Sequence, residues 1–134
     1  MSFREKSAWL MGGVTLLTGL YYLWLVIGRD GGPALAVVVP YVFVVIILSM
    51  IVQICLALIA PREANEGADE RDRLVADRAA RVSLTVLVTG LLIACGAYLA
   101  LPAEIEFFHL VVGAMIFAQL FEYGAQTALY RRGF

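Results

Sequence analysis

The chain alternates between four long apolar runs and short polar connections. The runs extend over residues 7–27, 34–60, 82–101 and 107–130. Each has about 20 residues or more, the length that a helix needs to cross the ~30 Å hydrocarbon core of a bilayer. The pattern therefore predicts an all-α polytopic membrane protein, with a single transmembrane domain of four spanning helices over residues 1–134.

The connections predict how these spans are arranged. GRDGGP (28–33) and LPAEIE (101–106) are short, so each should join an antiparallel hairpin, and the two hairpins should form a four-helix bundle. LLTGL (16–20) resembles LVTGL (87–91). The hairpins are then either a parallel repeat about an axis along the membrane normal or a chance match of apolar sequence.

Small residues three or four positions apart recur in the spans and offer places where helices approach closely. These pairs are Ala8 with Gly12, Gly90 with Ala94, Gly96 with Ala100, Ala114 with Ala118, and Gly124 with Ala128.

The positions of the basic residues predict the orientation. Nine of the ten Lys and Arg residues lie at the chain ends or in residues 61–81, and the tenth is Arg29. Positive residues favour the cytoplasmic side. We therefore expect both termini and the segment 61–81 in the cytoplasm, with the spans in a prokaryotic cytoplasmic membrane.

Composition supports this class and argues against others. The chain is 62% hydrophobic and 16% charged, with a mean hydropathy of +0.87, whereas soluble domains have ~25% charged residues. The first apolar run is 21 residues long, which is longer than the ~7–15 residues of a signal-peptide core, so we expect it to be a span. The net charge of −1 gives no basic field for direct nucleic-acid binding.

The residues offer little chemistry of an enzyme. No phosphate loop, CxxC motif or Ser/His/Asp set at one depth occurs, so we expect no catalytic residue and no cofactor. His109, the only histidine, lies near Glu106, but one histidine with scattered carboxylates is a poor metal pattern. Cys55 and Cys95 should differ in depth by more than ~10 Å, too far for a disulfide.

The segment 61–81 has helical charge spacing. Asp69 with Arg73, and Asp77 with Arg81, are acid-before-base pairs at i,i+4. Asp69 followed by Asp72 fits an N-terminal cap with an acidic third position. The third helix should therefore begin near Asp69, run to about Ala100 and extend about 15–18 Å into the cytoplasm.

Two interpretations of this segment stay open. It is either a solvated helix that orients its hairpin, or a docking surface for a cytoplasmic partner or a second copy of the chain. Leu74 and Val75 would add an apolar contact. The residues that would bind the partner are Asp69, Arg71, Arg73 and Asp77.

The sequence also resembles a known group of proteins. DERDRL (69–74), ADRAARVSLTVLV (76–88) and FREKSAWL (3–10) resemble segments of an uncharacterised family of small four-helix prokaryotic membrane proteins, which carry a D-E-R-D-like motif before a transmembrane helix. Some relatives are encoded beside small helix-turn-helix regulators, so the resemblance implies pairing with a regulatory protein. It implies no catalytic residue.

A polar stripe interrupts the last apolar run. Its members are Gln119, Glu122, Tyr123, Gln126 and Tyr130. Spacings of three and four place them within an arc of about 100° on a helix.

Other spans carry polar residues at a similar counted depth, about 10–14 Å from the cytoplasmic boundary. Gln53, Thr89 and Thr15 would complete one polar layer with Glu122. A carboxylate facing lipid at this depth costs roughly 2–3 kcal/mol, so Glu122 should face protein or water.

Two roles for Glu122 follow. It either hydrogen-bonds Gln53 or a second subunit and holds helices together, or it binds a cation or exchanges a proton in a cavity of a small transporter. We expect a homodimer or a larger membrane assembly. The leading hypothesis is a non-enzymatic accessory or regulatory membrane subunit that acts through its charged helix, and the alternative is a small homodimeric transporter using Glu122.

Overall fold

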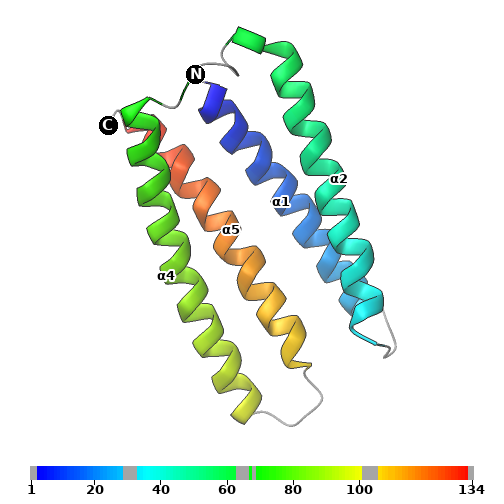
Figure 1. Ribbon diagram of the computed structural model, residues 1–134. Helices are drawn as coiled ribbons and strands as arrows, with labels where there is room; N and C mark the ends of the chain where they lie inside the picture. Colours follow the sequence, from blue (N-terminus) through cyan, green and yellow to red (C-terminus); the bar gives the residue numbers. More distant parts are fainter. Residues whose placement is uncertain (1–2, 29–32, 63–66, 68, 101–105, 133–134) are drawn as a thin grey trace.

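The computed structural model describes residues 3–28, 33–62, 67, 69–100 and 106–132. It contains four long helices (Figure 1): α1 (Phe3–Ile27), α2 (Leu35–Ile59), α4 (Glu70–Ala100) and α5 (Phe107–Arg131). Each is long and apolar enough to cross a bilayer, and no strand occurs in these ranges. The predicted all-α fold with four spans is confirmed. Most of both predicted short turns lies outside the described residues.

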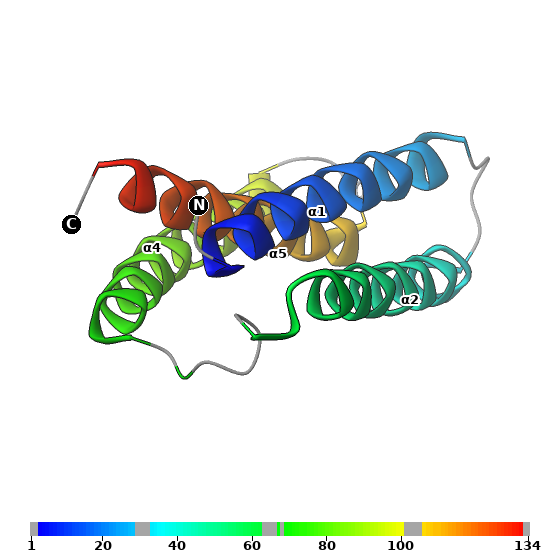
Figure 2. The same cartoon turned by 90° about the horizontal axis from the view of Figure 1, so that it is seen from above.

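The four helices form a bundle that is open on one side. α5 packs against α4 and α1, and α1 packs against α2, whereas α2 and α4 form no packed pair within the described ranges. Viewed from the end, α2 and α4 lie on the same side of α1 and α5 (Figure 2). Two cavities lie between the helices. One is lined by residues of α1, α2 and α5, and the other by residues of all four helices. We call this space the α2–α4 groove.

This arrangement is not that of a parallel repeat. A two-fold axis that exchanged the hairpins would place α1 on α4 and α2 on α5. The packed pair α1–α5 would then require a packed pair α4–α2, which is not formed in the part of the chain that the structure describes. The two similar glycine motifs nevertheless share a role, since both place a glycine against α5.

These glycines permit close approach. A Cβ atom at Gly19 of α1 would lie 2.9 Å from Cγ2 of Ile116, and one at Gly90 of α4 would lie 3.0 Å from Cβ of Ala114. At these distances Ile116 and Ala114 would have to shift to accommodate a side chain. Glycine therefore favours the close contact of α1 and α4 with α5.

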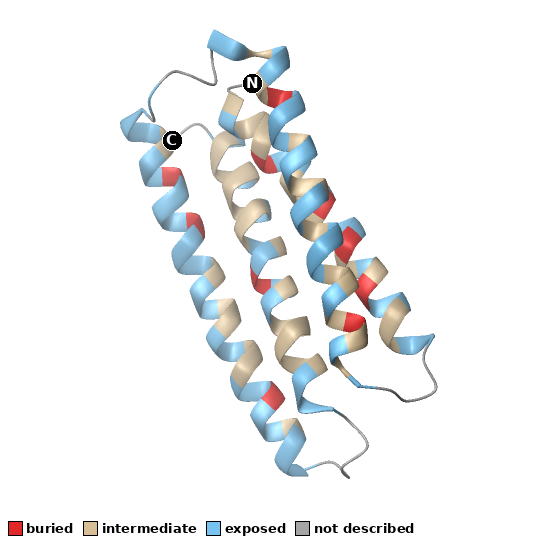
Figure 3. Ribbon diagram, turned by 45° about the vertical axis from the view of Figure 1, so that its right-hand side comes forward, coloured by how far each residue is buried: buried red, intermediate tan, exposed pale blue. Residues whose placement is uncertain are grey.

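Small residues also make up much of the interior. Four of the buried residues are alanines: Ala8, Ala79, Ala94 and Ala118. Buried positions are sparse along the helices, and most of the surface is exposed or half-buried (Figure 3). Close packing of small residues is the usual way in which helices associate in lipid. Three of the five predicted small-residue pairs lie at these contacts, whereas Gly96 and Gly124 face open space.

Side-chain contacts fix the relative heights of the helices. We call the end that carries Phe3 and Arg131 the terminal end. α4 and α5 are aligned there by the Tyr130 hydroxyl, which donates a hydrogen bond to Oδ1 of Asp72 at 2.9 Å. At mid-height, Ser83 Oγ donates a hydrogen bond to the Ala118 carbonyl at 3.0 Å. On the other side of the molecule, the Gln53 amide of α2 donates to Ser7 of α1 at 3.0 Å.

This alignment has a consequence for the charged turns of α4. The helix is the longest, at 31 residues. Asp69 occupies the N-cap position, since its carbonyl accepts the Arg73 N–H at 3.1 Å. Its Oδ1 accepts the N–H of the adjacent Glu70 at 2.7 Å, and not that of the second or third helical residue as in the predicted cap. The turns from Asp72 to Arg81, about 13 Å long, lie beside α1 and α5 rather than beyond them. They are level with about residues 47–56 of α2, because Asp72 contacts Arg4 and Gln53 contacts Ser7; these residues are apolar apart from Ser49 and Gln53.

We predict that Gly90→Val weakens the contact between α4 and α5. The added side chain would meet Ala114, and overpacking of this kind costs about 1–3 kcal/mol. Reversible unfolding of the purified protein in mixed micelles would measure the loss. Gly96→Val is the matched control, because that glycine of the same helix has no atom within 4 Å of its added Cβ. Equal stability of the two variants would contradict the packing described above.

Candidate functional site

A cluster of polar side chains joins three helix ends at the terminal end. Oδ2 of Asp72 lies 3.2 Å from Nε of Arg4 in α1, and Oδ1 accepts the Tyr130 hydroxyl of α5 at 2.9 Å. Nη2 of Arg71 donates to the Tyr130 carbonyl at 3.3 Å. We call Arg4, Arg71, Asp72 and Tyr130 the Asp72 cluster. Hydrogen bonds to charged groups contribute about 1.5–3 kcal/mol each, less where one partner is solvated, as Arg4 is.

The sequence did not reveal this cluster. Asp72 was interpreted only as part of a helix cap, and its partners lie 58 residues away in the chain at Tyr130 and near the N-terminus at Arg4. Pairing over such separations depends on how the helices pack. The one signal in the sequence was the unusual density of charge before the third span.

The predicted partner-binding residues occupy two sides of α4. All four, Asp69, Arg71, Arg73 and Asp77, are exposed. Asp69 caps the helix and Arg71 belongs to the Asp72 cluster. Val75 and Ala79 are buried against the bundle. Arg73 and Asp77 each lie two residues before one of these, so about 160° around the helix, and they point outward.

The expected ion pairs along α4 are not formed. Within the described residues, neither Asp69 with Arg73 nor Asp77 with Arg81 makes a salt bridge, and the ion pair of this segment is Arg4 with Asp72. Exposed pairs at i,i+4 contribute only about 0.3–0.5 kcal/mol. That gain does not hold two long side chains together against solvation. The outward face of α4 therefore keeps its charges in contact with the surroundings.

Gln119, Tyr123, Gln126 and Tyr130 of the polar stripe line cavities of the α2–α4 groove, whereas Glu122 lines neither cavity. The predicted bond from Glu122 to Gln53 is wrong, and its alternative, a bond to a second subunit, stays a prediction. Oε1 of Glu122 accepts the Gln126 amide of its own helix at 3.5 Å, the long limit of a hydrogen bond. Gln53 instead donates to Ser7. Likewise, the Gln119 amide donates to the Tyr123 hydroxyl at 3.5 Å. These two contacts run along α5 itself. The member of the stripe that bonds another helix is Tyr130, which donates to Asp72 of α4, and none of these bonds links α5 to α2.

Thr89 does not belong to this layer. It is exposed on α4, whereas Ala76 lines the groove. Thirteen residues separate the two, which places Thr89 about 140° around the helix from Ala76. Thr89 also lies ten residues, about 15 Å, further from the terminal end than Ala79, which the Ser83–Ala118 contact places level with Glu122. The counted depth failed because it took Arg81 as a membrane boundary, whereas the turns around Arg81 lie beside the other helices.

Two adjoining cavities lie in the groove. The one at the terminal end has a volume of about 320 Å³ and is the more polar. The second, of about 490 Å³, lies between α1, α2 and α5 and carries Thr15, Thr18, Ser49 and Gln119 among apolar residues. Met11 and Tyr123 line both cavities and so stand between them. The polar residues of the first cavity are Arg4, Ser7, Gln53, Asp72, Gln126 and Tyr130.

The height of Glu122 explains why the stripe is polar only toward the terminal end. Glu122 is four residues beyond Ala118, which is level with Ser83. It therefore lies about 6 Å nearer the terminal end than Ser83, level with Ala79. The polar half of α5 and the charged turns of α4 occupy the same height, so charge and polarity gather in one layer of the molecule.

A second polar contact ties the helices at the opposite end. Nδ1 of His109 lies 2.6 Å from the Tyr22 hydroxyl of α1, and Nε2 lies 2.9 Å from Oε2 of Glu106. Tyr22 is buried and stacks at a tilt on Tyr41 of α2 with ring centroids 4.9 Å apart. The histidine therefore connects α5 to the first hairpin.

The described ranges contain neither a cluster of metal ligands nor a disulfide. No group of three or more His, Cys, Asp and Glu residues close enough to hold a metal ion occurs there. Cys55 and Cys95 are free and exposed.

The fold and these sites define an integral membrane protein with four spanning helices. The sequence matches the family described as predicted membrane protein (DUF2178) over residues 4–134. The chain belongs to this family, whose function is unknown, and the resemblance to a family of small four-helix membrane proteins is confirmed. No curated protein and no solved structure matched the chain.

We predict that Asp72→Ala destabilises the bundle by about 1–3 kcal/mol, because it leaves Tyr130 and Arg4 without their shared acceptor. Tyr130→Phe should cost less, since Asp72 keeps its contact with Arg4. Unfolding in mixed micelles measures both. Asp77→Ala is the control: it removes an exposed carboxylate one and a half turns away and should stay within about 0.5 kcal/mol. If Asp77→Ala lowered the free energy of unfolding as much as Asp72→Ala, the Asp72 cluster would not be what stabilises the bundle.

Proposed function

We propose that this protein is a non-enzymatic accessory or regulatory subunit of a prokaryotic cytoplasmic membrane. It binds a cytoplasmic regulatory protein through the charged turns of α4. Both termini and the α4 charges lie on the cytoplasmic side, because nine of the ten basic residues lie at that end. Arg73 and Asp77 form the centre of the contact, flanked by Arg71 and Asp69.

The observation that carries the proposal is the Asp72 cluster. It holds the first turns of α4 against α1 and α5, while Arg73 and Asp77 of the same turns stay exposed on the outward side. A rigid surface loses little conformational freedom on binding, so more of the contact energy appears as affinity. A solvated helix that only oriented its hairpin would not need to be fixed to two other helices.

The mixed sign of the charges indicates the kind of partner. The segment 61–81 carries five arginines and six acidic residues, so it is not a polybasic membrane anchor. Arg73, Asp77 and Arg81 alternate in sign along the outward face. A protein surface with the opposite alternation matches it, and charge patterns of this kind favour specificity and correct orientation.

Assembly with further subunits is part of the proposal. The described helices bury few residues, and long apolar faces, above all that of α2, lie exposed. Lipid covers such faces well, but within the chain the helices pack through small residues, as at Gly90, and contacts between subunits can form in the same way. A homodimer or a larger membrane assembly formed in the same way fits the open bundle.

Recovery of the partner from cells tests the proposal. The double variant R73Q/D77N is expressed as the full chain and solubilised in mild detergent. We expect it to recover at least tenfold less of the copurifying cytoplasmic protein than the parent chain does. Insertion into the membrane should be unchanged, because both side chains point away from the bundle.

The control variant is R132Q, which removes a charge at the same end but from α5. Unaltered recovery with R73Q/D77N would overturn the proposal, as would labelling that finds a cysteine at position 73 accessible only from outside the cell.

The alternative function, a small homodimeric transporter, draws support from the polar cavity of about 320 Å³. Gln126 lines this cavity and hydrogen-bonds Glu122, so a cation or proton entering from the terminal end would come close to the carboxylate.

Reconstituted vesicles separate the two functions. A transporter should give cation or proton flux above empty vesicles, and Glu122→Gln should reduce that flux at least tenfold because it removes the charge while preserving the shape. The control is Gln119→Ala, one turn away, which keeps the carboxylate. Flux equal to that of empty vesicles, or an unaffected Glu122→Gln variant, excludes transport through this residue.

A further inference from the structure

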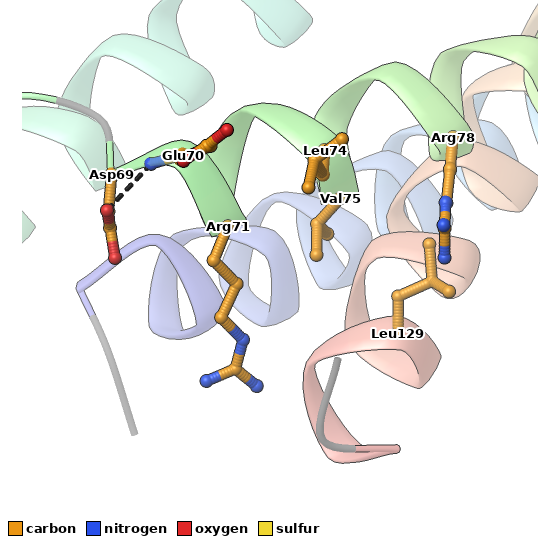
Figure 4. Close-up of a pocket in the computed structure, with 7 residues that line it drawn as sticks. All are labelled: Asp69, Glu70, Arg71, Leu74, Val75, Arg78 and Leu129. Atoms are coloured by element: carbon orange, nitrogen blue, oxygen red, sulfur yellow. Dashed lines mark hydrogen bonds between the residues drawn. The ribbon is translucent and has the colours of Figure 1, made fainter.

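A separate cavity lies on the other flank of α4, between its first turns and the end of α5. Its volume is about 330 Å³. Arg71, Arg78 and Asp69 supply charge to its lining, and Leu74, Val75 and Leu129 supply apolar surface. Figure 4 shows Arg71 and Arg78 extending from one side of α4, with Arg78 beside Leu129 of α5, whereas Glu70 extends from the other side. Asp69 lies at the start of the helix, where its carboxylate accepts the Glu70 N–H.

The lining has an order along the helix. Arg78 lies nearest the apolar part of α4, which begins at Val82. Arg71 follows two turns closer to the terminal end, about 10 Å away, and the Asp69 carboxylate stands at the outermost position. Val75 and Leu129 lie between the two arginines (Figure 4). Going outward, the cavity therefore presents apolar surface with one arginine, then the second arginine, then a carboxylate.

We propose that this cavity binds the headgroup of a phospholipid that carries both a phosphate and a primary ammonium, as phosphoethanolamine does. The guanidinium groups of Arg71 and Arg78 hold the phosphate between them. The Asp69 carboxylate accepts hydrogen bonds from the ammonium at the outer end. Leu74, Val75 and Leu129 contact the glycerol and the first carbons of the acyl chains.

The position of the cavity favours a lipid over a soluble phosphate. Arg71 is bonded to the carbonyl of Tyr130, at the end of the apolar run of α5, and Leu74 beside it is 53% exposed. Both observations place the cavity where headgroups lie. Arginine is suited to phosphate because its planar fork makes two parallel hydrogen bonds to the oxygens.

The carboxylate decides which headgroup fits. A headgroup with only a negative charge would meet the Asp69 carboxylate in the lining and be repelled by it. A choline headgroup offers no N–H to a carboxylate and is usually held by aromatic side chains, which the lining of this cavity lacks. A primary ammonium satisfies the carboxylate directly.

The inference does not depend on the proposed function. The centre of the partner contact, Arg73 and Asp77, lies outside the lining of the cavity, whereas Arg71 and Asp69 at the edge of that contact also line the cavity. Loss of partner recovery in R73Q/D77N and loss of lipid binding in R71Q/R78Q are separate measurements, so the failure of one proposal can be told from the failure of the other.

Native mass spectrometry of the purified full chain tests the site. The protein in detergent is mixed with equal amounts of short-chain phosphatidylethanolamine, phosphatidylcholine and phosphatidylglycerol, and the bound lipid is counted. We expect phosphatidylethanolamine to be retained about tenfold over the other two. R71Q/R78Q should abolish this preference and reduce total binding at least tenfold.

Two further variants test the role of the Asp69 carboxylate and of an arginine outside the cavity. D69N preserves helix capping, because Asn caps as well as Asp, and should bring the ethanolamine and choline lipids to equal binding while phosphate-dependent binding persists. R62Q removes an exposed arginine of the segment 61–81 outside the cavity and should leave lipid binding unchanged.

Four outcomes overturn the proposal: equal binding of all three lipids, preference for phosphatidylglycerol, no effect of R71Q/R78Q, or competition by free phosphoethanolamine at the concentration of the lipid. The last result would show that the cavity recognises a soluble phosphate.

Discussion

Helices in lipid gain nothing from burying apolar surface against one another, so their association depends on close packing and a few polar bonds. In this molecule α5 receives both kinds of contact from two sides. Gly19 of α1 and Gly90 of α4 bring the neighbouring backbones close to it, and Ser83 bonds its backbone at mid-height. The central position of α5, and with it the relative height of every other helix, follows from these contacts.

Once the heights are fixed, the charges of α4 and the polar stripe of α5 become one feature. Asp72 and Tyr130 are bonded, and one turn further in, Gln126 lines the same cavity as Ala76 of α4. A carboxylate at Glu122 is then not an isolated group deep in hydrocarbon. It lies at about the height of Arg78, in the layer where α4 carries its charged turns, and a hydrated layer at this height would lower its cost in either of its proposed roles.

The sequence predicted what depends on local pattern. Span number, the start of α4 at Asp69 and the use of small pairs such as Gly90 with Ala94 all follow from hydrophobic length, capping chemistry and residue size. It failed where two helices had to be placed against each other. Gln53 was assigned to Glu122 because their counted depths agreed, but depth says nothing about direction, and the amide points to Ser7 instead. Exact heights depend on packing between distant residues.

The alignment also implies that the molecule is tilted in the bilayer. α2 is apolar to Ile59, which is 80% exposed, and needs hydrocarbon at the height where α4 carries charge from Asp72 to Arg81. The two requirements differ by about 13 Å. Helix axes are ~8–10 Å apart in contact, so α2 and α4, separated by the groove, lie roughly 18 Å apart. A common tilt of ~20° offsets about 6–7 Å of the difference. Arg78 and Arg81 extend toward the headgroups and account for the rest, which places the flank of α4 among lipid phosphates.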